Sequence, residues 1–293
     1  TQYGIYGPHN AITDAMDAAR MRQLGAAGVL QHLRSLSGVA QHVLYYGPLE
    51  STQVSRLVNE VHPMSEHPEA AHDGQFYTPL QVDESRVIIA PFQAKNTYMM
   101  GYSSRGEQFS LALQPYVGVF NEYFGGGMNS IVFQELRESR GLAYNASALF
   151  SQASRPSDRE WFFTRIITQN DKLKDCLNVF DEIVEQMPQS ESAFSLAREA
   201  VIKRLATQRI LREQILDYYL RCRDQGLDDD PDKAVYEKVK TMTMADLLSF
   251  HEREIAKRKY HLLLLGDEAD WDMSSLQQRG AIQRVTLKDI FGY

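Results

Sequence analysis

The spacing of hydrophobic positions divides the chain into two regions. In the first region, apolar residues between positions 10 and 32 recur at helical spacing, which predicts a helix. Residues 39–46 are rich in β-forming side chains and stop at Gly47-Pro48, which predicts a strand, and Ser51 is placed to cap a second helix. The first region is therefore predicted to run from helix to strand to helix.

The second region, from residue 86 onward, shows strand and helix periodicities in turn. Short runs of β-forming residues predict strands over 86–91, 97–102, 144–151, 161–167 and 260–266. Helical spacing predicts helices over 109–124, 129–139, 171–187 and 190–223, and further helices starting at Asp230-Pro231 and at Thr243. Strands that come before and after runs of helices indicate an α+β fold.

A segment without periodicity separates the two regions. Residues 62–85 contain three prolines and no regular spacing, which is typical of a linker. We therefore predict that residues 1–75 are the C-terminal part of a preceding α+β domain plus its linker. Residues 80–280 are predicted to form a complete domain, and residues 281–293 a C-terminal tail. The strand and helix of the first region resemble the end of the second, which favours a preceding domain of similar build.

Composition and charge exclude several classes of protein. The chain has 293 residues, 43% of them hydrophobic and 24% charged, which is ordinary for a globular protein. The formal net charge is -7 and no basic stripe is interleaved with aromatics, so nucleic acid is not an expected partner. No apolar run approaches the roughly 18 residues that span a bilayer. Cys176 and Cys222 fall in predicted helices, which excludes a disulfide framework and leaves the compartment open.

Three consecutive glycines separate two of the predicted helices. Gly125, Gly126 and Gly127 are not followed by a Lys-Ser/Thr pair and no strand directly precedes them, so they match neither nucleotide-binding fingerprint. Glycines allow positive φ angles and close backbone approach, and Asn129 or Ser130 is placed to cap the next helix. On these residues alone, the glycines are best interpreted as a structural turn.

Arg137 and Tyr144 lie on either side of a predicted helix end. Gly141 stands where a left-handed C-terminal residue is expected, so Arg137 falls on the last turn and Tyr144 leads the next strand. A guanidinium and a phenol are both donors that stabilise a developing oxyanion. The alternative is that Arg137 only favours the helix C-terminus and that Tyr144 is a half-buried strand residue.

A longer string gives these residues a context. Residues 120–148 read FNEYFGGGMNSIVFQELRESRGLAYNASA, which resembles the non-metal half of the insulinase (pitrilysin) family of zinc metallopeptidases. The similarity extends more loosely from about residue 86 to residue 267. The resemblance implies a largely antiparallel sheet with helices packed on one face. It also implies that Arg137 and Tyr144 face the active site from the opposite half of a clamshell, bind the substrate backbone and stabilise the tetrahedral intermediate.

The same resemblance implies a substrate-binding role for the glycine turn. It places Gly125, Gly126, Gly127 and Asn129 among the residues that contact the peptide. This expectation stands beside the purely structural interpretation of the turn.

The zinc motif of the family is absent from the sequence. The catalytic half of such enzymes carries H-x-x-E-H, in which two His four residues apart share one helix face. The nearest approach here is His62 and His67, which are five apart with Pro63 between them, and His251-Glu252 is followed by Ile255 where a second His is required. His62, His67 and His72 could bind a metal adventitiously, but a solvated linker is the favoured interpretation of this segment, because the irregular spacing provides no preformed coordination geometry. No metal ligand or cofactor is therefore expected in this chain.

These observations predict an incomplete enzyme. The chain is expected to bind peptide or protein substrate opposite a zinc-bearing half, carried on the same polypeptide or on a partner subunit, and to be inactive alone. The alternative is an insulinase-like scaffold or protein-binding module without catalysis. Because the chain begins at Thr1 rather than Met, we expect it to be a piece of a longer protein. For the parent protein, bacterial periplasm or cell envelope is the expected location.

Overall fold

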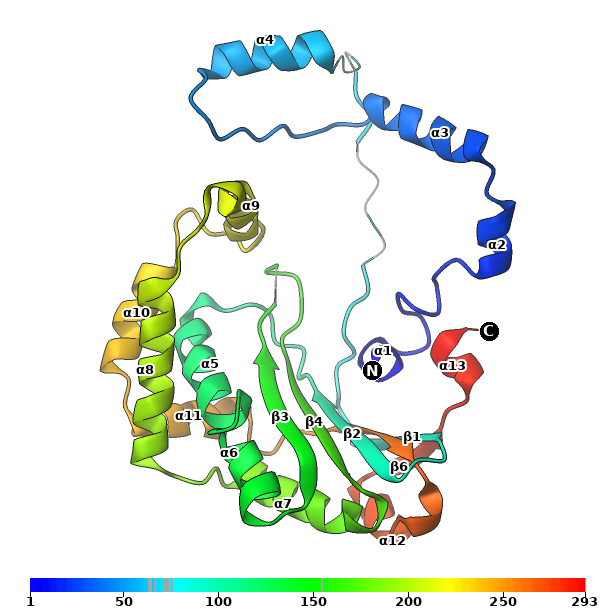
Figure 1. Cartoon of the computed structure of the whole chain (residues 1–293), viewed down its shortest axis with the longest axis vertical. Helices are drawn as coiled ribbons and strands as arrows, with labels where there is room; N and C mark the ends of the chain where they lie inside the picture. The colour runs from blue at the N-terminus through cyan, green and yellow to red at the C-terminus, as the bar shows by residue number, and fades with distance from the viewer. Residues whose placement is uncertain (63–64, 66, 71–73, 75, 154, 293) are drawn as a thin grey trace. The chain divides into compact units, whose positions relative to one another are not determined.

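The computed structural model describes residues 1–62, 65, 67–70, 74, 76–153 and 155–292. The chain divides into two compact units (Figure 1). The larger unit comprises residues 1–13, 77–209 and 221–293, and the smaller one comprises residues 14–76 and 210–220. Within the described residues, no helix is both long and apolar enough to cross a membrane.

The larger unit is built on one mixed sheet of six strands. The strands are β1 (Arg86–Pro91), β2 (Asn96–Ser103), β3 (Ala143–Ser151), β4 (Trp161–Gln169), β5 (His261–Gly266) and β6 (Ala281–Arg284). Their order across the sheet is β3-β4-β2-β5-β1-β6. The pairings β3/β4, β4/β2 and β2/β5 are antiparallel, whereas β1 pairs in parallel with both β5 and β6. The α+β fold and the five predicted strands of the second region are confirmed.

Helical segments surround this sheet. Those of the larger unit are α1 (Gln2–Tyr6), η2 (Leu111–Leu113), α5 (Gln114–Phe120), η3 (Asn121–Gly125), α6 (Ile131–Phe133), η4 (Gln134–Ser139), η5 (Asn170–Lys172), α7 (Leu173–Glu185), α8 (Glu191–Thr207), α10 (Asp232–Thr241), α11 (Met244–Glu254), η7 (Glu268–Asp270), α12 (Met273–Arg279) and α13 (Leu287–Phe291). Helix α9 (Ile215–Asp224) crosses the boundary between the units. The smaller unit contains α2 (Ala18–Gln23), α3 (Ala26–Ser35), η1 (Leu36–Gly38), α4 (Ser51–Val61) and η6 (Arg212–Gln214).

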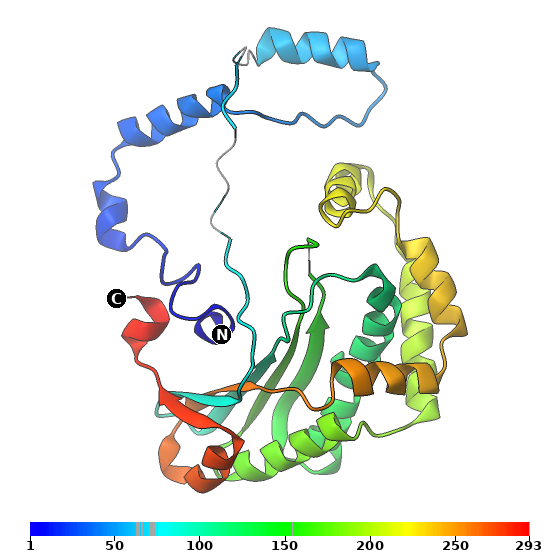
Figure 2. The same cartoon turned by 180° about the vertical axis from the view of Figure 1, so that it is seen from behind.

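The main hydrophobic core lies on one face of the sheet. Alternate strand residues such as Met99, Phe162 and Leu264 are buried in it together with α5, α7, α8 and α11. Figures 1 and 2 show these helices gathered on one side of the strands. On the opposite face, Tyr98 and Leu265 are exposed. One face of the sheet is therefore covered by helices, as the resemblance implied.

Two terminal segments extend the larger unit beyond the predicted 80–280 domain. Strand β6 lies in the predicted tail and pairs with β1, because the backbone of β1 offers a second hydrogen-bonding edge. Helix α1 places Ile5 in a small cluster with Val82 and Tyr102 on the face opposite the main core. The unit therefore draws on residues from both ends of the described chain.

The first region departs from its predicted elements. Residues 39–46 do not form a strand. Within the part of the chain that the structure describes, their one pairing is a single bridge from Val39 to Glu69, and β-forming residues need a partner strand. The helix predicted over 10–32 is replaced by turns followed by α2 and α3. The side chain of Asn10 accepts the backbone N–H groups of Ile12 and Thr13, which favours a turn over a helix start. The helix predicted from Ser51 is confirmed as α4.

The helix predicted over 190–223 is also interrupted. Helix α8 ends at Thr207, and the chain becomes helical again only at Arg212. The Arg209 guanidinium donates to the carbonyl oxygens of Ala206 and Gln208 at 3.1 and 2.9 Å. This arginine satisfies carbonyl groups that a continuing helix would have bonded internally, so the helix ends there.

Candidate functional site

The glycine turn joins two helices that both widen into π-helical turns. Segment η3 precedes the turn and η4 follows α6, and π turns occur frequently at functional sites. The Asn121 side chain accepts the backbone N–H of Phe150 at 2.7 Å and donates to its carbonyl at 2.9 Å. A Cβ at Gly125 would overlap the backbone of Ala148, so only glycine lets η3 lie this close to β3.

The remainder of the turn faces solvent. Gly126, Gly127, Met128 and Asn129 are exposed, and Met128 keeps 73% of its accessible surface. The loop is nevertheless held in place, since the Ser130 hydroxyl donates to the Gly127 carbonyl at 2.7 Å. Of the two predicted capping residues, Ser130 rather than Asn129 stands at the N-cap position of α6. A Cβ at Gly125 would meet the backbone of Ala148, and one at Gly126 would meet the backbone of Asn121. Neither position approaches Arg137 or Tyr144 in this way.

Arg137 lies where the sequence places it, near the end of a helical segment. Gly141 has a φ of +58°, and its N–H donates to the Arg137 carbonyl at 3.1 Å. This left-handed residue ends the segment and directs the chain into β3. The Arg137 side chain is 43% exposed and lies 3.5 Å from the Glu138 carboxylate. Its cation is therefore accessible from solvent.

Tyr144 is directed outward by a β-bulge that the sequence did not reveal. In the β3/β4 ladder Ala143 pairs with Thr168 and Asn145 with Ile167, so Tyr144 is the extra residue. In a regular strand Tyr144 would share the buried face of Ala146, two residues away. The bulge instead leaves Tyr144 75% exposed. Among the described residues, its hydroxyl makes no hydrogen bond.

The structure brings Arg137 and Tyr144 together. The Arg137 guanidinium carbon lies 5.6 Å from the centre of the Tyr144 ring and 4.9 Å from the centre of the Phe133 ring. The neighbouring Arg140 is engaged with Glu182 at 3.1 Å and with Glu135 at 3.4 Å. Within the described chain, Arg137 has one carboxylate neighbour, the exposed Glu138, whereas Arg140 has two, so Arg137 is the arginine at this helix end better placed to meet a ligand anion or carbonyl alongside the Tyr144 hydroxyl. Sequence reasoning missed Phe133, although its position four residues before Arg137 is a signal for contact on a helix.

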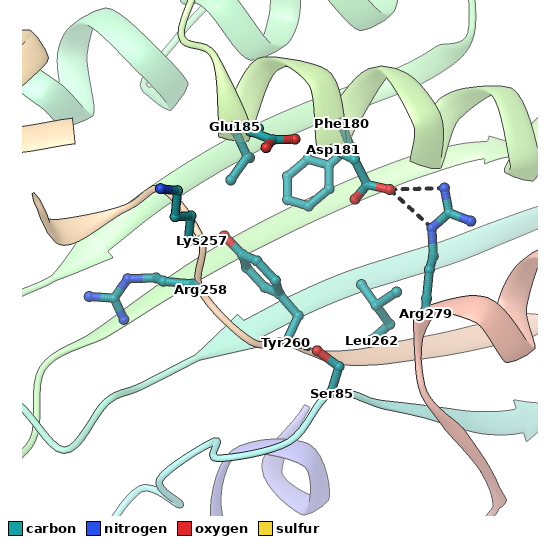
Figure 3. Close-up of a pocket in the computed structure, with 10 residues that line it drawn as sticks. Ser85, Phe180, Asp181, Glu185, Lys257, Arg258, Tyr260, Leu262 and Arg279 are labelled. Carbon is teal, nitrogen blue, oxygen red and sulfur yellow. Dashed lines mark hydrogen bonds and ion pairs between the residues drawn. The ribbon is translucent and has the colours of Figure 1, made fainter. Parts of the chain in front are cut away.

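A separate cavity of about 280 Å³ lies between α7, β5 and the end of α12 (Figure 3). Its lining includes Arg279, whose guanidinium bonds Asp181 at 2.9 Å and Asn178 at 2.6 Å. Burial raises the pKa of Asp181 even though Arg279 opposes the shift. Burial likewise raises the pKa of Tyr260, whose hydroxyl has no partner among the described residues. Both arginines of this lining are engaged, Arg279 in holding α12 on α7 and Arg258 in an ion pair with Glu107, so the cavity is less suited to ligand binding than the exposed Arg137–Tyr144 pair.

The residues present do not fit a zinc site. Among the described residues, no group of three His, Cys, Asp or Glu side chains is placed to hold a metal ion. His251 and His261 are each buried at separate positions, and burial lowers the pKa of each imidazole. The His62 ring bonds the Gln41 side chain at 2.8 Å. The metal site considered at His62, His67 and His72 is only partly described, because His72 lies outside the described residues. Pro63, Met64 and Glu66, which belong to the segment nearest in pattern to H-x-x-E-H, also lie outside them.

Solved structures share this fold at low sequence identity. A peptidase M16 inactive domain from Pseudomonas fluorescens matches with a TM-score of 0.67 and 17% identity, over 92% of this chain and 64% of that chain. A conserved protein from Enterococcus faecalis matches with a TM-score of 0.68 and 13% identity, over 87% of this chain and 58% of that chain. The ferredoxin protease FusC, as a mutant in complex with Arabidopsis ferredoxin, matches with a TM-score of 0.66 and 10% identity, over 91% of this chain and 29% of that one. This chain therefore spans less than two thirds of each of these relatives.

The sequence itself matches one family model. No functionally curated protein matches the chain. The model of the peptidase M16 inactive domain matches residues 38–201, which include the glycine turn, Arg137 and Tyr144. In this family the zinc belongs to the other half, which agrees with the missing H-x-x-E-H motif. The chain belongs to the peptidase M16 inactive-domain family, the non-metal half of the insulinase-type metallopeptidases.

Proposed function

We propose that this chain binds peptide substrate opposite a zinc-bearing half and stabilises the tetrahedral intermediate with Arg137 and Tyr144. The observation that carries the proposal is the pairing of an accessible guanidinium with an outward-facing phenol, 5.6 Å from ring centre to guanidinium carbon. The bulge at Tyr144 leaves the aromatic ring and its hydroxyl largely exposed to solvent. A local irregularity that exposes a donor is better explained by a ligand.

The two side chains supply complementary hydrogen-bond donors. Arg137 is a permanent cation with a planar fork, so it suits a carbonyl that becomes an oxyanion during peptide attack. The Tyr144 hydroxyl is a second donor that is not engaged by the protein itself. Donors that are fixed before the reaction stabilise charge that develops only in the transition state. The chain itself would bind and orient the peptide and help to exclude water from the site.

Two findings support a partner half and a polypeptide substrate. The chain spans between 29% and 64% of the solved relatives named above, so each of them carries additional structure. One of those relatives is a protease in complex with a protein, ferredoxin. From that complex we infer for this chain only that its ligand is a polypeptide. The exposed Gly126, Gly127 and Asn129 would contact it along the turn, where small residues leave room for a peptide backbone.

A scaffold role is the second candidate. It is favoured by the match to an inactive domain and by the lack of metal-ligating groups among the described residues. In that case the chain would bind protein without contributing to hydrolysis. Replacing Arg137 would then change only the binding of protein. Mixing this chain with a zinc-bearing half would produce no peptidase activity.

Peptide binding by the chain tests the proposal directly. A fluorescein-labelled, unstructured peptide of about twenty residues is titrated with the chain and followed by fluorescence anisotropy. We expect Arg137→Ala to raise Kd about tenfold, because a hydrogen bond from a charged group to the peptide is lost. Arg140→Ala is the matched control, since it removes the same charge from the same helix end but belongs to the Glu135 and Glu182 ion pairs. Equal Kd values for wild type and Arg137→Ala would rule out the proposed site.

A further inference from the structure

Phe133 lies directly beneath the guanidinium of Arg137. It is the last residue of α6, immediately before the π-helical segment η4 that carries Arg137. Its side chain is only 9% exposed, so the surrounding protein fixes its ring. The Arg137 guanidinium carbon lies 4.9 Å from the centre of this ring. One buried aromatic residue thus supports an otherwise accessible cation.

Two aromatic rings lie within cation–π distance of the guanidinium. Phe133 contacts it from within the helix, and Tyr144 contacts it from the bulge of β3. Each ring face carries partial negative charge and attracts a cation. An arginine side chain has several rotatable bonds, and holding it in one position costs conformational entropy. A ring that is already buried limits that freedom before any ligand arrives.

A competing interaction makes this support necessary. The Glu138 carboxylate lies 3.5 Å from Arg137 Nε and is itself about half exposed, with 51% of its side-chain surface accessible. An exposed ion pair of this kind is weak and does not fix geometry. The ion pair with Glu138 therefore leaves the position of the guanidinium weakly determined, whereas the buried Phe133 ring provides a fixed contact 4.9 Å away.

We propose that Phe133 is a positioning residue that holds the Arg137 guanidinium next to Tyr144 for peptide binding. The inference rests on the proposed function of Arg137, and it adds a residue that contacts neither substrate nor metal. Phe133 lies four residues before Arg137, at the end of α6, and this spacing brings the two side chains to the same side of the helical segment. Phe133 is therefore expected to act through Arg137 rather than through the core.

Three variants of the full chain separate these roles. Phe133→Leu removes the ring and retains an apolar side chain, whereas Phe133→Tyr retains the ring. Val132→Ala is the control for a structural defect, because Val132 is fully buried and neighbours Phe133 in α6. The melting temperature of each variant is measured first. Phe133→Met serves in place of Phe133→Leu if that variant does not fold, since Met fills irregular space without a ring.

Two readouts report on the position of Arg137. With the same labelled peptide, Phe133→Leu is expected to raise Kd about fivefold, in keeping with the loss of a cation–π contact. Phe133→Tyr should bind like wild type, and Val132→Ala should lower the melting temperature without changing Kd. In a two-dimensional ¹H–¹⁵N spectrum, the ring-current shift of the Arg137 Nε–H proton should change in Phe133→Leu, where only the Tyr144 ring remains nearby, and should be retained in Val132→Ala.

The outcomes distinguish this proposal from the one it rests on. If Arg137→Ala binds weakly while Phe133→Leu binds like wild type, the positioning role is wrong and the proposed site stands. If Phe133→Leu and Val132→Ala weaken binding equally, the effect of Phe133 is structural and the positioning role is again wrong. If Arg137→Ala itself binds like wild type, the proposed function fails and the role of Phe133 fails with it.

Discussion

Replacing Arg137 by Ala in the proposed complex of this chain with a zinc-bearing half is expected to lower kcat by about 10²-fold to 10³-fold, the range seen when one oxyanion donor is removed. The accessible guanidinium beside Tyr144 would contact the substrate carbonyl most strongly when it becomes an oxyanion. The affinity for substrate should change less, because the interaction is strongest in the transition state. Steady-state kinetics with the zinc-bearing half and a quenched fluorescent peptide measure both quantities.

Two further variants make this result interpretable. Tyr144→Phe removes only the hydroxyl and keeps the ring beside Arg137, so it should lower kcat less than Arg137→Ala does. Arg140→Ala should leave kcat within about twofold of wild type, because its guanidinium is engaged by Glu135 and Glu182 in surface ion pairs of small net effect. An Arg137→Ala enzyme with an unchanged kcat would remove both Arg137 and Tyr144 from the mechanism.

Replacing Glu160 by Gln is expected to stabilise the chain at pH 8. Glu160 immediately precedes β4 and is fully buried, and neither carboxylate oxygen has a hydrogen-bond partner among the described residues. The backbone of Glu160 is well satisfied, since Ser104 Oγ donates to its carbonyl at 2.7 Å and its N–H donates to the Glu107 carbonyl at 2.6 Å. Burial removes the hydration of the side chain, and the Ser110 backbone N–H and the Arg258 guanidinium nearby offset only part of that cost for a charged group.

The environment of Glu160 favours its protonated form. Burial, reinforced by the charges of Glu107 and Glu254, raises the pKa of Glu160 from 4.5 to about 7, while the backbone N–H of Ser110 and the Arg258 guanidinium oppose the shift. Arg258 is itself buried and ion-paired with Glu107. Between pH 4.5 and about 7 the folded chain thus binds more protons at this group than the unfolded chain does. The contribution of Glu160 to stability is complete below pH 4.5 and is lost as the pH rises through 7.

Urea unfolding at several pH values measures this effect. At pH 8, Glu160→Gln should raise the free energy of unfolding by on the order of 2 kcal/mol, because the buried side chain no longer has to ionise. At pH 4.5 the variant and wild type should be nearly equal. Glu199→Gln is the matched control, since the Glu199 side chain is 53% exposed and its substitution should leave stability almost unchanged at both pH values. A Glu160→Gln chain that is less stable than wild type at pH 8 would show that the carboxylate is ionised and paired in the folded state.

The second region was predictable because its signals are local and agree with one another. Strand alternation, helix stripes and the turn residues between them all indicate the same elements, as with Thr243, whose side chain caps α11. That Arg137 and Tyr144 could reach one site was also predictable from the sequence, because Gly141 indicated where the helix ends. The family resemblance supplied the role that the residues alone left open.

The remaining features depend on contacts distant in sequence. Residues 39–46 have the composition of a strand, but a strand forms only where another strand pairs with it. Strand β6 is short and weakly patterned, and it exists because β1 has a free edge. The bulge at Tyr144 arises from the register between β3 and β4, which no local pattern in β3 records. The contact of Phe133 with Arg137 could have been predicted from their four-residue spacing on a helix, but the position of the Tyr144 ring beside the same guanidinium depends on the bulge and came only from the structure.

Hydrolysis by separate and combined halves tests the central claim most directly. The chain is incubated with zinc and a quenched fluorescent peptide, alone and after mixing with a zinc-bearing half of the kind proposed above. We predict no cleavage by the chain alone and clear cleavage by the mixture, reduced when the chain carries Arg137→Ala. Cleavage by the chain alone, or a mixture that binds the peptide and never cleaves it, would contradict the account.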